Sequence, residues 1–494
     1  MNRRRLIPVA AALALLVGCA TVGPDFHAPA PAVPAQRPTS APDLASGLPV
    51  SEKVLPQRWW TVFGDPVLDG LQARLLENSL DLRNAVLRFA QSRLQRSVVA
   101  SQALPHVDAR AQATRQRQSE HGAETRLVRA LPGANREEIA ELLAEPFPLY
   151  QAGFDASWEL DLWGRVRRSV ESADAGVEAA DALLAQARLA LSGELARAYF
   201  NLRLAQRQQA LLDEQAAVAR DALGLLEGQA AHGLIADDEV LAQRARVAEL
   251  QALRPPLRAR EAALLNQLTT LSGVLPGALN EALAPLPLPA DAAAPALPDL
   301  ALGLPSALAR RRPDLRAAEA QLHAATADIG IAVADLYPRI ALGASAGLQS
   351  IEAGRFGEWS SRTWQIGPVL SLPLFDHGRR RATVELRKLQ QQQAAVAYQQ
   401  AVLKAWQEID DALADYAAQR QRHARLRERL DERHRAWALA QGRRASGLSS
   451  ELPVLQARQA WLQARADLAD NDARLSTALV AVFKAAGGGM DGGE

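Results

Sequence analysis

The chain has 494 residues, of which 48% are hydrophobic and 22% charged, and its 56 basic and 55 acidic side chains leave a formal net charge of +1. This balance gives no electrostatic reason to expect nucleic acid or an acidic partner. One cysteine excludes a disulfide framework and a cysteine-cluster metal site. The sequence contains no glycine-rich phosphate loop and no nucleophile elbow. We therefore expect no enzyme, no metal site, no bound cofactor and no nucleic-acid partner.

Residues 1–18 have the pattern of a secretory signal peptide. Arg3–Arg5 form a basic start, and residues 6–17 form an apolar run too short to span a bilayer. Leu16-Val17-Gly18-Cys19 matches a lipobox, which predicts a diacylglycerol on the Cys19 sulfur and an N-acyl chain on its amino group after cleavage. The alternative is an ordinary signal peptide with a chance cysteine. Ala20 in place of aspartate favours the outer membrane as the destination of the lipoprotein.

A proline-rich tether is predicted for residues 19–58, because prolines recur from Pro24 to Pro49 and favour an extended chain. No later run of 18 apolar residues is present, so no transmembrane helix is expected. The glycines at 487–489 predict a disordered tail over residues 487–494.

The body of the chain is a duplication. Asp81 precedes Pro105 by 24 residues, and Asp314 precedes Pro338 by the same number, within similar surroundings. Further on, 69 residues separate Gly164 from Gly233 and also Gly378 from Gly447. We therefore predict a first structural repeat over residues 59–298 and a second over residues 299–486.

Each repeat is predicted to contain two strands with alternating apolar residues. The strands are expected at about 105–118, 148–163, 337–349 and 362–375, and the first of them has the weakest pattern. A period of two over about ten residues is typical of a tilted strand that crosses an outer membrane. A half-buried sheet in a soluble protein has the same period. Periodicity alone leaves both alternatives open.

Long helices are predicted over about 165–272 and 378–486. In the first copy, apolar residues recur every seventh position, which indicates a coiled-coil seam; they are Leu184, Leu191, Ala198, Ala205, Leu212, Ala219 and Leu226. In the second copy His423 interrupts the equivalent row. A helix of 69 residues is about 100 Å long and must project into an aqueous space.

The predicted fold is mostly α with membrane β. Four strands are too few to close a transmembrane barrel, which needs about eight, and open sheet edges are not tolerated in lipid. A membrane-spanning chain must therefore form an oligomer, and three chains would supply 12 strands.

The chain resembles the TolC-type outer membrane efflux proteins, and in particular the lipoprotein (NodT-type) branch that serves RND pumps. The resemblance covers about residues 19–486. Its motifs are Val22-Gly23-Pro24-Asp25-Phe26, Trp59-Trp60, Phe63-Gly64-Asp65-Pro66, Asp155 to Arg165, Leu304 to Glu319 with Arg311-Arg312-Pro313-Asp314, Tyr337-Pro338, Ile366-Gly367-Pro368 and Leu372 to Asp376.

This resemblance implies a homotrimer with a 12-stranded β-barrel in the outer membrane, continuous with a 12-helix α-barrel in the periplasm. It implies a passive exit duct for drugs or other small toxic compounds. The partners would be a periplasmic adaptor protein, an inner-membrane RND pump and outer membrane lipid. The alternatives are a duct for type I protein secretion, a duct for metal-ion efflux, and a structural envelope lipoprotein without a pore.

In this family the two helix turns distant from the membrane form the closed aperture, where the adaptor docks. Here they fall at Gly233 to Val240 and Gly447 to Gln456. The first carries Asp237, Asp238 and Glu239, which form either an anionic ring or only the acidic first turn of a helix. The second departs from the family: positions that are often acidic are Pro453 and Gln456, and Glu451 is the nearest acid.

Two other motifs are expected to be structural. Trp59-Trp60 would anchor the tether against the body of the protein. The basic run Arg310-Arg311-Arg312, which Asp314 follows, would flank a helix and form salt bridges.

Overall fold

The computed structural model describes residues 21–29, 50–51, 56, 58–122, 126, 136–287, 300–301 and 311–488. The signal peptide, Cys19 and most of the predicted tether lie outside these residues. The chain forms two compact units, and each unit takes segments from both repeats. The first unit comprises residues 1–28, 92–177 and 321–395, and the second comprises residues 29–91, 178–320 and 396–494.

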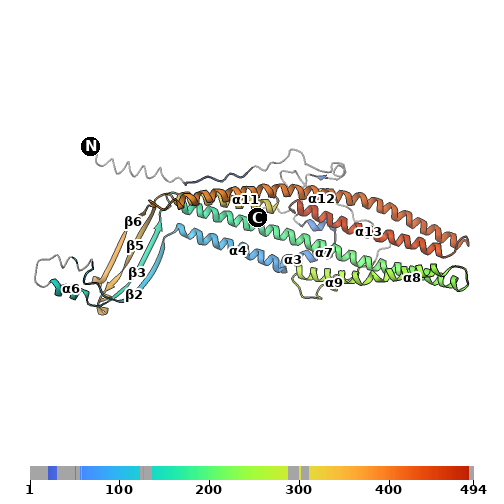
Figure 1. The fold of residues 1–494 in the computed structure, drawn as a ribbon, viewed down its shortest axis with the longest axis horizontal. Helices are drawn as coiled ribbons and strands as arrows, with labels where there is room; N and C mark the ends of the chain where they lie inside the picture. Colours follow the sequence, from blue (N-terminus) through green and yellow to red (C-terminus); the bar gives the residue numbers. More distant parts are fainter. Residues whose placement is uncertain are drawn as a thin grey trace. The chain divides into compact units, whose positions relative to one another are not determined.

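The first unit contains a sheet of four antiparallel strands in the order β2-β3-β5-β6 (Figure 1). The strands are β2 (His106–Gln116), β3 (Phe147–Glu159), β5 (Arg339–Ser350) and β6 (Arg362–Ser371). β3 and β6 are about four residues shorter than the sequence pattern indicates, because the chain leaves the sheet to begin the following helices. The loop between β2 and β3 also contains a helix that the pattern did not reveal, α6 (Arg136–Ala144).

The register of the strands separates the two faces of the sheet by polarity. Val107, Ala156, Ala344 and Ile366 lie side by side across all four strands. The neighbouring row, on the opposite face, consists of Asp108, Asp155, Ser345 and Gln365. The alternation continues along the sheet, with Phe154, Ala346 and Trp364 in the next apolar row. The sheet therefore has one apolar and one polar face across its whole width.

The long helices lie within the predicted ranges with one additional break, and shorter helices precede the first strand of each repeat. They are α3 (Pro66–Asn78), α4 (Leu80–Ala100), α7 (Arg165–Ala231), α8 (Asp237–Ala252), α9 (Arg254–Leu271), α11 (Pro313–Ala334), α12 (Arg379–Ala445) and α13 (Leu452–Ala485). The break between α8 and α9 at Leu253 precedes Pro255 and Pro256, which cannot donate the backbone hydrogen bonds of a continuous helix. Among the described residues, no helix has the length and apolar character needed to cross a membrane.

The predicted heptad row of α7 is the buried seam of this helix. Six of its seven residues are buried, and Leu191 is partly buried. In the second unit, Leu211 and Val218 of α7 pack with Leu455 and Leu462 of α13. His423, which interrupts the row in α12, is also buried, and its Nε2 lies 3.1 Å from Oδ1 of Asp472 in α13.

The largest core of the second unit contains the two tryptophans of the Trp59-Trp60 motif. They lie in a short 3-10 helix, Trp59–Phe63, and both are buried. The Trp59 ring stacks on Phe483 of α13 with 5.4 Å between the ring centroids. Gly487 and Gly488 continue this packing, since Gly488 lies against Trp59 and Leu189. The tail predicted to begin at residue 487 is therefore ordered for its first two residues, and residues 489–494 lie outside the described part of the chain.

Candidate functional site: the polar sheet face, the strand-to-helix junctions and the helix turns

The polar face of the sheet carries most of the charged side chains of the strands. Arg115 and Arg362 lie on the apolar face, near the end of the sheet away from the long helices. Nε2 of His106 lies 3.1 Å from Oδ2 of Asp108, and Nε of Arg110 lies 3.4 Å from Oδ2 of Asp155. All four side chains are substantially exposed. A sheet with this division of its faces can contact lipid with one face and water with the other.

The two strand-to-helix junctions repeat each other closely. Gly164 precedes α7 with φ +80°, and Gly378 precedes α12 with φ +81°, a backbone conformation that glycine adopts without strain. Asp161 accepts hydrogen bonds from the backbone N–H groups of Val166 and Arg167. In the second copy, Asp376 accepts from the N–H groups of Gly378 and Arg380. Each aspartate thus satisfies free donors at the start of a long helix.

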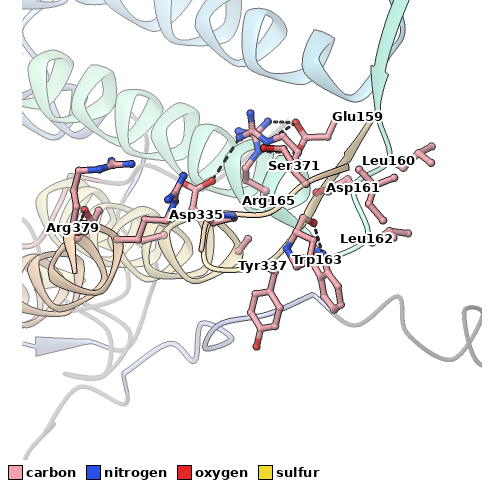
Figure 2. A pocket seen from close by; sticks show the side chains of 18 residues that line it. Glu159, Leu160, Asp161, Leu162, Trp163, Arg165, Asp335, Tyr337, Ser371 and Arg379 are labelled. Carbon is pink, nitrogen blue, oxygen red and sulfur yellow. Dashed lines mark hydrogen bonds and ion pairs between the residues drawn. The ribbon is translucent and has the colours of Figure 1, made fainter. Parts of the chain in front are cut away.

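A pocket of about 280 Å³ lies at these junctions in the first unit (Figure 2). Glu159 accepts two hydrogen bonds from Arg165, at 2.9 and 2.8 Å, and both side chains are largely buried. Arg339 lies 3.6 Å from Glu159 and 3.7 Å from Asp335. Arg379 also lines the pocket, and no side-chain partner of Arg379 is found within the described ranges.

Aromatic residues occupy the other side of the same junction. The rings of Trp163 and Tyr337 stack with 4.7 Å between their centroids, and the Trp163 indole N–H donates to the Pro338 carbonyl. Figure 2 shows this pair on the opposite side of the strand ends from the Glu159–Arg165 ion pair. Aromatic residues at the ends of apolar strands are typical of membrane–water interfaces.

The two helix turns singled out by the repeat have the same backbone structure. The Gly233 N–H donates to the Ala230 carbonyl and the Leu234 N–H to the Gln229 carbonyl, with Gly233 at φ +66°. The Gly447 and Leu448 N–H groups donate to the Arg444 and Arg443 carbonyls in the same pattern, with Gly447 at φ +73°. These are Schellman motifs, which end a helix with a left-handed glycine. Leu234 and Leu448 remain exposed.

The candidate aperture residues follow these glycines directly. Asp237, Asp238 and Glu239 are the first three residues of α8, and all are exposed. The N-cap of α8 is Ala236, which makes no side-chain cap hydrogen bond, and the three acids lie in the first turn of the helix.

The second turn differs from the first in its charges. Glu451 is the N-cap of α13 and forms an ion pair with Arg444. Pro453 stands in the first helical turn, where its missing N–H costs no hydrogen bond, and Gln456 is exposed.

The motif near the N-terminus, Val22–Phe26, has defined contacts with the body of the protein. The Val22–Phe26 segment is attached to the body in the first unit through Arg168, whose side chain is almost fully buried. Arg168 donates to Asp25 at 2.6 Å, to the Val22 carbonyl at 3.3 Å and to Glu171 at 2.7 Å. The hydrogen bond from Arg168 lowers the pKa of the Asp25 carboxyl. No single-residue pattern near Arg168 predicts this contact, because its partner is 143 residues away.

Comparison with known proteins assigns the fold and the family. The sequence matches the outer membrane efflux protein family over residues 71–274 and 304–488. Outer membrane protein OprJ of Pseudomonas aeruginosa is 31% identical over 98% of this chain and 95% of its own length. The solvent efflux pump outer membrane protein SrpC of Pseudomonas putida is 29% identical and covers 97% of both chains.

Solved structures agree with this assignment. The outer-membrane channel OprN superimposes with a TM-score of 0.81 at 32% identity, over 95% of this chain and 99% of that one. The Campylobacter jejuni CmeC outer membrane channel shares the fold at the same TM-score and 23% identity. From the duplicated strand and helix units, the two-faced sheet and these similarities, we conclude that the chain belongs to the outer membrane efflux protein family, a family of channel proteins located in the outer membrane.

Proposed function

We propose that three copies of this chain form the exit duct of a tripartite efflux system, through which drugs or other small toxic compounds pass from the periplasm to the exterior. The observation that carries the proposal is the two-faced sheet. Its apolar face suits lipid, and its polar face suits a water-filled passage. The relatives support the same function, since SrpC and TtgI are each described as the outer membrane protein of an efflux pump.

The trimer follows from the edges of the sheet. β2 and β6 are the outer strands, and each has one partner strand within the described part of the chain. In lipid their remaining backbone groups need hydrogen-bond partners. Pairing of β6 with β2 of a neighbouring copy satisfies these groups, and three copies close a 12-stranded barrel. The long helices α7 and α12 then continue each copy into a periplasmic helical barrel.

The proposed partners are a periplasmic adaptor and an inner-membrane pump of the RND type. We place the adaptor contact and the aperture at the two helix turns, with Gly233, Asp237, Asp238 and Glu239 in the first and Gly447, Glu451, Pro453 and Gln456 in the second. Exposure of both turns supports this placement. We further propose that a diacylglycerol and an N-acyl chain on Cys19 anchor the protein in the outer membrane.

A susceptibility panel tests the proposed function. The gene is deleted, and growth inhibition by dyes, detergents, several antibiotic classes and metal salts is compared with that of the complemented strain. We expect sensitisation to organic compounds. Sensitisation to metals alone would favour metal-ion efflux instead, and failure to secrete a protein without any sensitisation would favour type I secretion.

Conductance of the purified protein in a planar bilayer tests the pore itself. We expect stepwise currents from the trimer. A protein that stays silent, even after neutralisation of the acids in the first turn, would be a structural lipoprotein without a pore.

A further inference from the structure

The duplication of the chain is incomplete at one charged position. Arg165 and Arg379 are equivalent, because each follows the left-handed glycine that precedes a long helix, Gly164 or Gly378. Arg165 is paired with Glu159, six residues earlier. Six residues before Arg379 the chain carries Pro373, which has no charge. The second repeat therefore retains the cation and lacks its carboxylate.

The other charges of the junction are paired with one another. Arg380 pairs with Asp376 at 3.0 Å, and Arg167 lies 3.4 Å from Asp161. Arg339 is shared between Glu159 and Asp335. Each of these charged side chains has an ion-pair partner. Among the described residues that line the pocket, Arg379 is the charged side chain without one.

The pocket that Arg379 lines includes residues of the polar face of the sheet. Its side chain is exposed and lines the same pocket as Ser371 and Arg339. Ser371 and Arg339 face each other in the register of β5 and β6, on the polar face of the sheet. In Figure 2, Arg379 and Asp335 are drawn away from the stacked Trp163 and Tyr337 rings. In a duct this polar face contacts the passing solution.

We infer that Arg379 is an anion-binding group on the water-filled side of the strand-to-helix junction, and that it favours solutes with a carboxylate, sulfonate or phosphate group. The inference rests on the proposed function, since it needs a conducting trimer. Three copies would place three such guanidinium groups around one passage. A guanidinium donates paired hydrogen bonds to planar or tetrahedral oxyanions.

The test is the reversal potential of the full-length trimer in a planar bilayer under a potassium chloride gradient. Arg379→Gln is compared with wild type, with Arg379→Lys and with Arg381→Gln. Arg381 is an exposed arginine of the same helix that does not line the pocket, so its replacement removes one charge as a matched control. The same variants are measured with sodium benzoate, which provides an organic carboxylate.

We expect Arg379→Gln to lower the permeability of chloride and benzoate relative to the cation by about twofold, the effect of one unit charge acting through about 10 Å of water. Arg379→Lys should retain the wild-type ratio for chloride, and Arg381→Gln should leave both ratios unchanged.

Three outcomes would contradict this inference. An unchanged ratio in a conducting Arg379→Gln trimer would overturn it and leave the duct intact. Equal shifts in both glutamine variants would also overturn it, because the cause would then be net charge. A less stable Arg379→Gln trimer with unchanged selectivity would assign Arg379 to a contact with the neighbouring copy. A protein that carries no current at all would instead contradict the proposed function.

Discussion

At the scale of single residues, every side-chain nitrogen of the buried Arg312 donates a hydrogen bond. Arg312 connects the start of α11 with α12 and α13 in the second unit. It donates to both carboxylate oxygens of Asp314 at 3.0 and 2.7 Å, to Glu408 at 2.5 Å and to the Ala485 carbonyl at 2.8 Å. Burial tends to lower the pKa of the Arg312 guanidinium, but the two carboxylates outweigh it and raise the pKa. Arg312 is thus a structural connection, as the sequence context of the basic run indicates, whereas Arg310 lies outside the described residues.

Replacement of Arg312 by alanine should destabilise the protein strongly. Removing the cation leaves two carboxylates and a buried carbonyl without their donor, which costs about 3 kcal/mol of unfolding free energy. Denaturant unfolding of the purified trimer, followed by circular dichroism, measures this change. Arg311→Ala is the matched control and should change the free energy by about 0.5 kcal/mol or less. Equal effects of the two substitutions would contradict the assigned role of Arg312.

Attachment of the Val22–Phe26 segment should depend on pH through Asp25. The folded pKa of Asp25 lies below its unfolded value of about 3.9. The ion pair with Arg168 therefore contributes fully above that value and disappears as the pH falls through the folded pKa. A nitroxide on Ala28→Cys, followed by electron paramagnetic resonance, should gain mobility below about pH 4.

Asp25→Asn is the control for this measurement. It removes the titrating group, so the label should show the same mobility at neutral and acidic pH. A label that gains mobility equally in both proteins would show that another group controls the segment.

At the scale of elements, the effect of a substitution on the stability of the sheet depends on the face that the residue occupies. Ala344 lies on the apolar face of β5 and Ser345, the next residue, on the polar face. Ala344→Arg should cost about 2–4 kcal/mol, because it places a charge against the hydrocarbon of the bilayer. Ser345→Arg should cost about 0.5 kcal/mol or less, because its side chain remains in water.

Folding into lipid vesicles at increasing urea concentrations, measured by the gel shift of the folded trimer, compares the two variants. The opposite order of stability would assign the polar face of the sheet to lipid and would contradict the proposed duct.

Local hydrogen bonds determine where the long helices begin and end. Aspartates accept the first backbone donors of α7 and α12, and left-handed glycines end both helices with the same hydrogen-bond pattern. Both kinds of hydrogen-bonded helix end involve only residues that are close in sequence. For this reason the boundaries of α7 and α12 lie within a few residues of the repeat landmarks Gly164, Gly233, Gly378 and Gly447.

At the scale of the whole molecule, the acids of the first helix turn should affect closure of the duct. In the proposed trimer, three copies of Asp237 and Asp238 stand near one axis. Ion pairs between these acids and basic side chains of the neighbouring copies would hold the resting aperture. Asp237→Ala with Asp238→Ala removes these ion pairs. Each is worth about 0.5–1 kcal/mol, so leak conductance should rise by about two- to fivefold per ion pair. Entry of antibiotics should rise with it. Planar-bilayer conductance and growth inhibition measure both effects.

Glu249→Ala serves as the control for the turn. Glu249 is an exposed acid of α8 that pairs with Arg246. Its replacement should leave conductance unchanged. An unchanged conductance in the Asp237 and Asp238 double variant would leave these acids as the first turn of α8, where negative charge stabilises the positive end of the helix.

The sequence by itself determined the features that depend on spacing along the chain. The duplication, the family, the four alternating strands and the heptad seam of α7 all follow from residues at fixed short intervals. The same reasoning missed the break at Leu253 and extended β3 and β6 too far. At these places local turn and proline chemistry ends an element before its apolar pattern does.

Only the tertiary structure decided which residues are partners. The contact of Arg168 with Asp25 and the bridge of Arg312 to Glu408 and Ala485 each depend on segments that are distant in sequence. Arg165 and Arg379 occupy equivalent positions after equivalent glycines, so those glycines do not distinguish them. Part of the difference is local, because Glu159 stands six residues before Arg165 and the uncharged Pro373 stands six residues before Arg379. Only the fold shows that no other side chain in the described ranges pairs with Arg379, since chain spacing does not specify the distances over which charges interact.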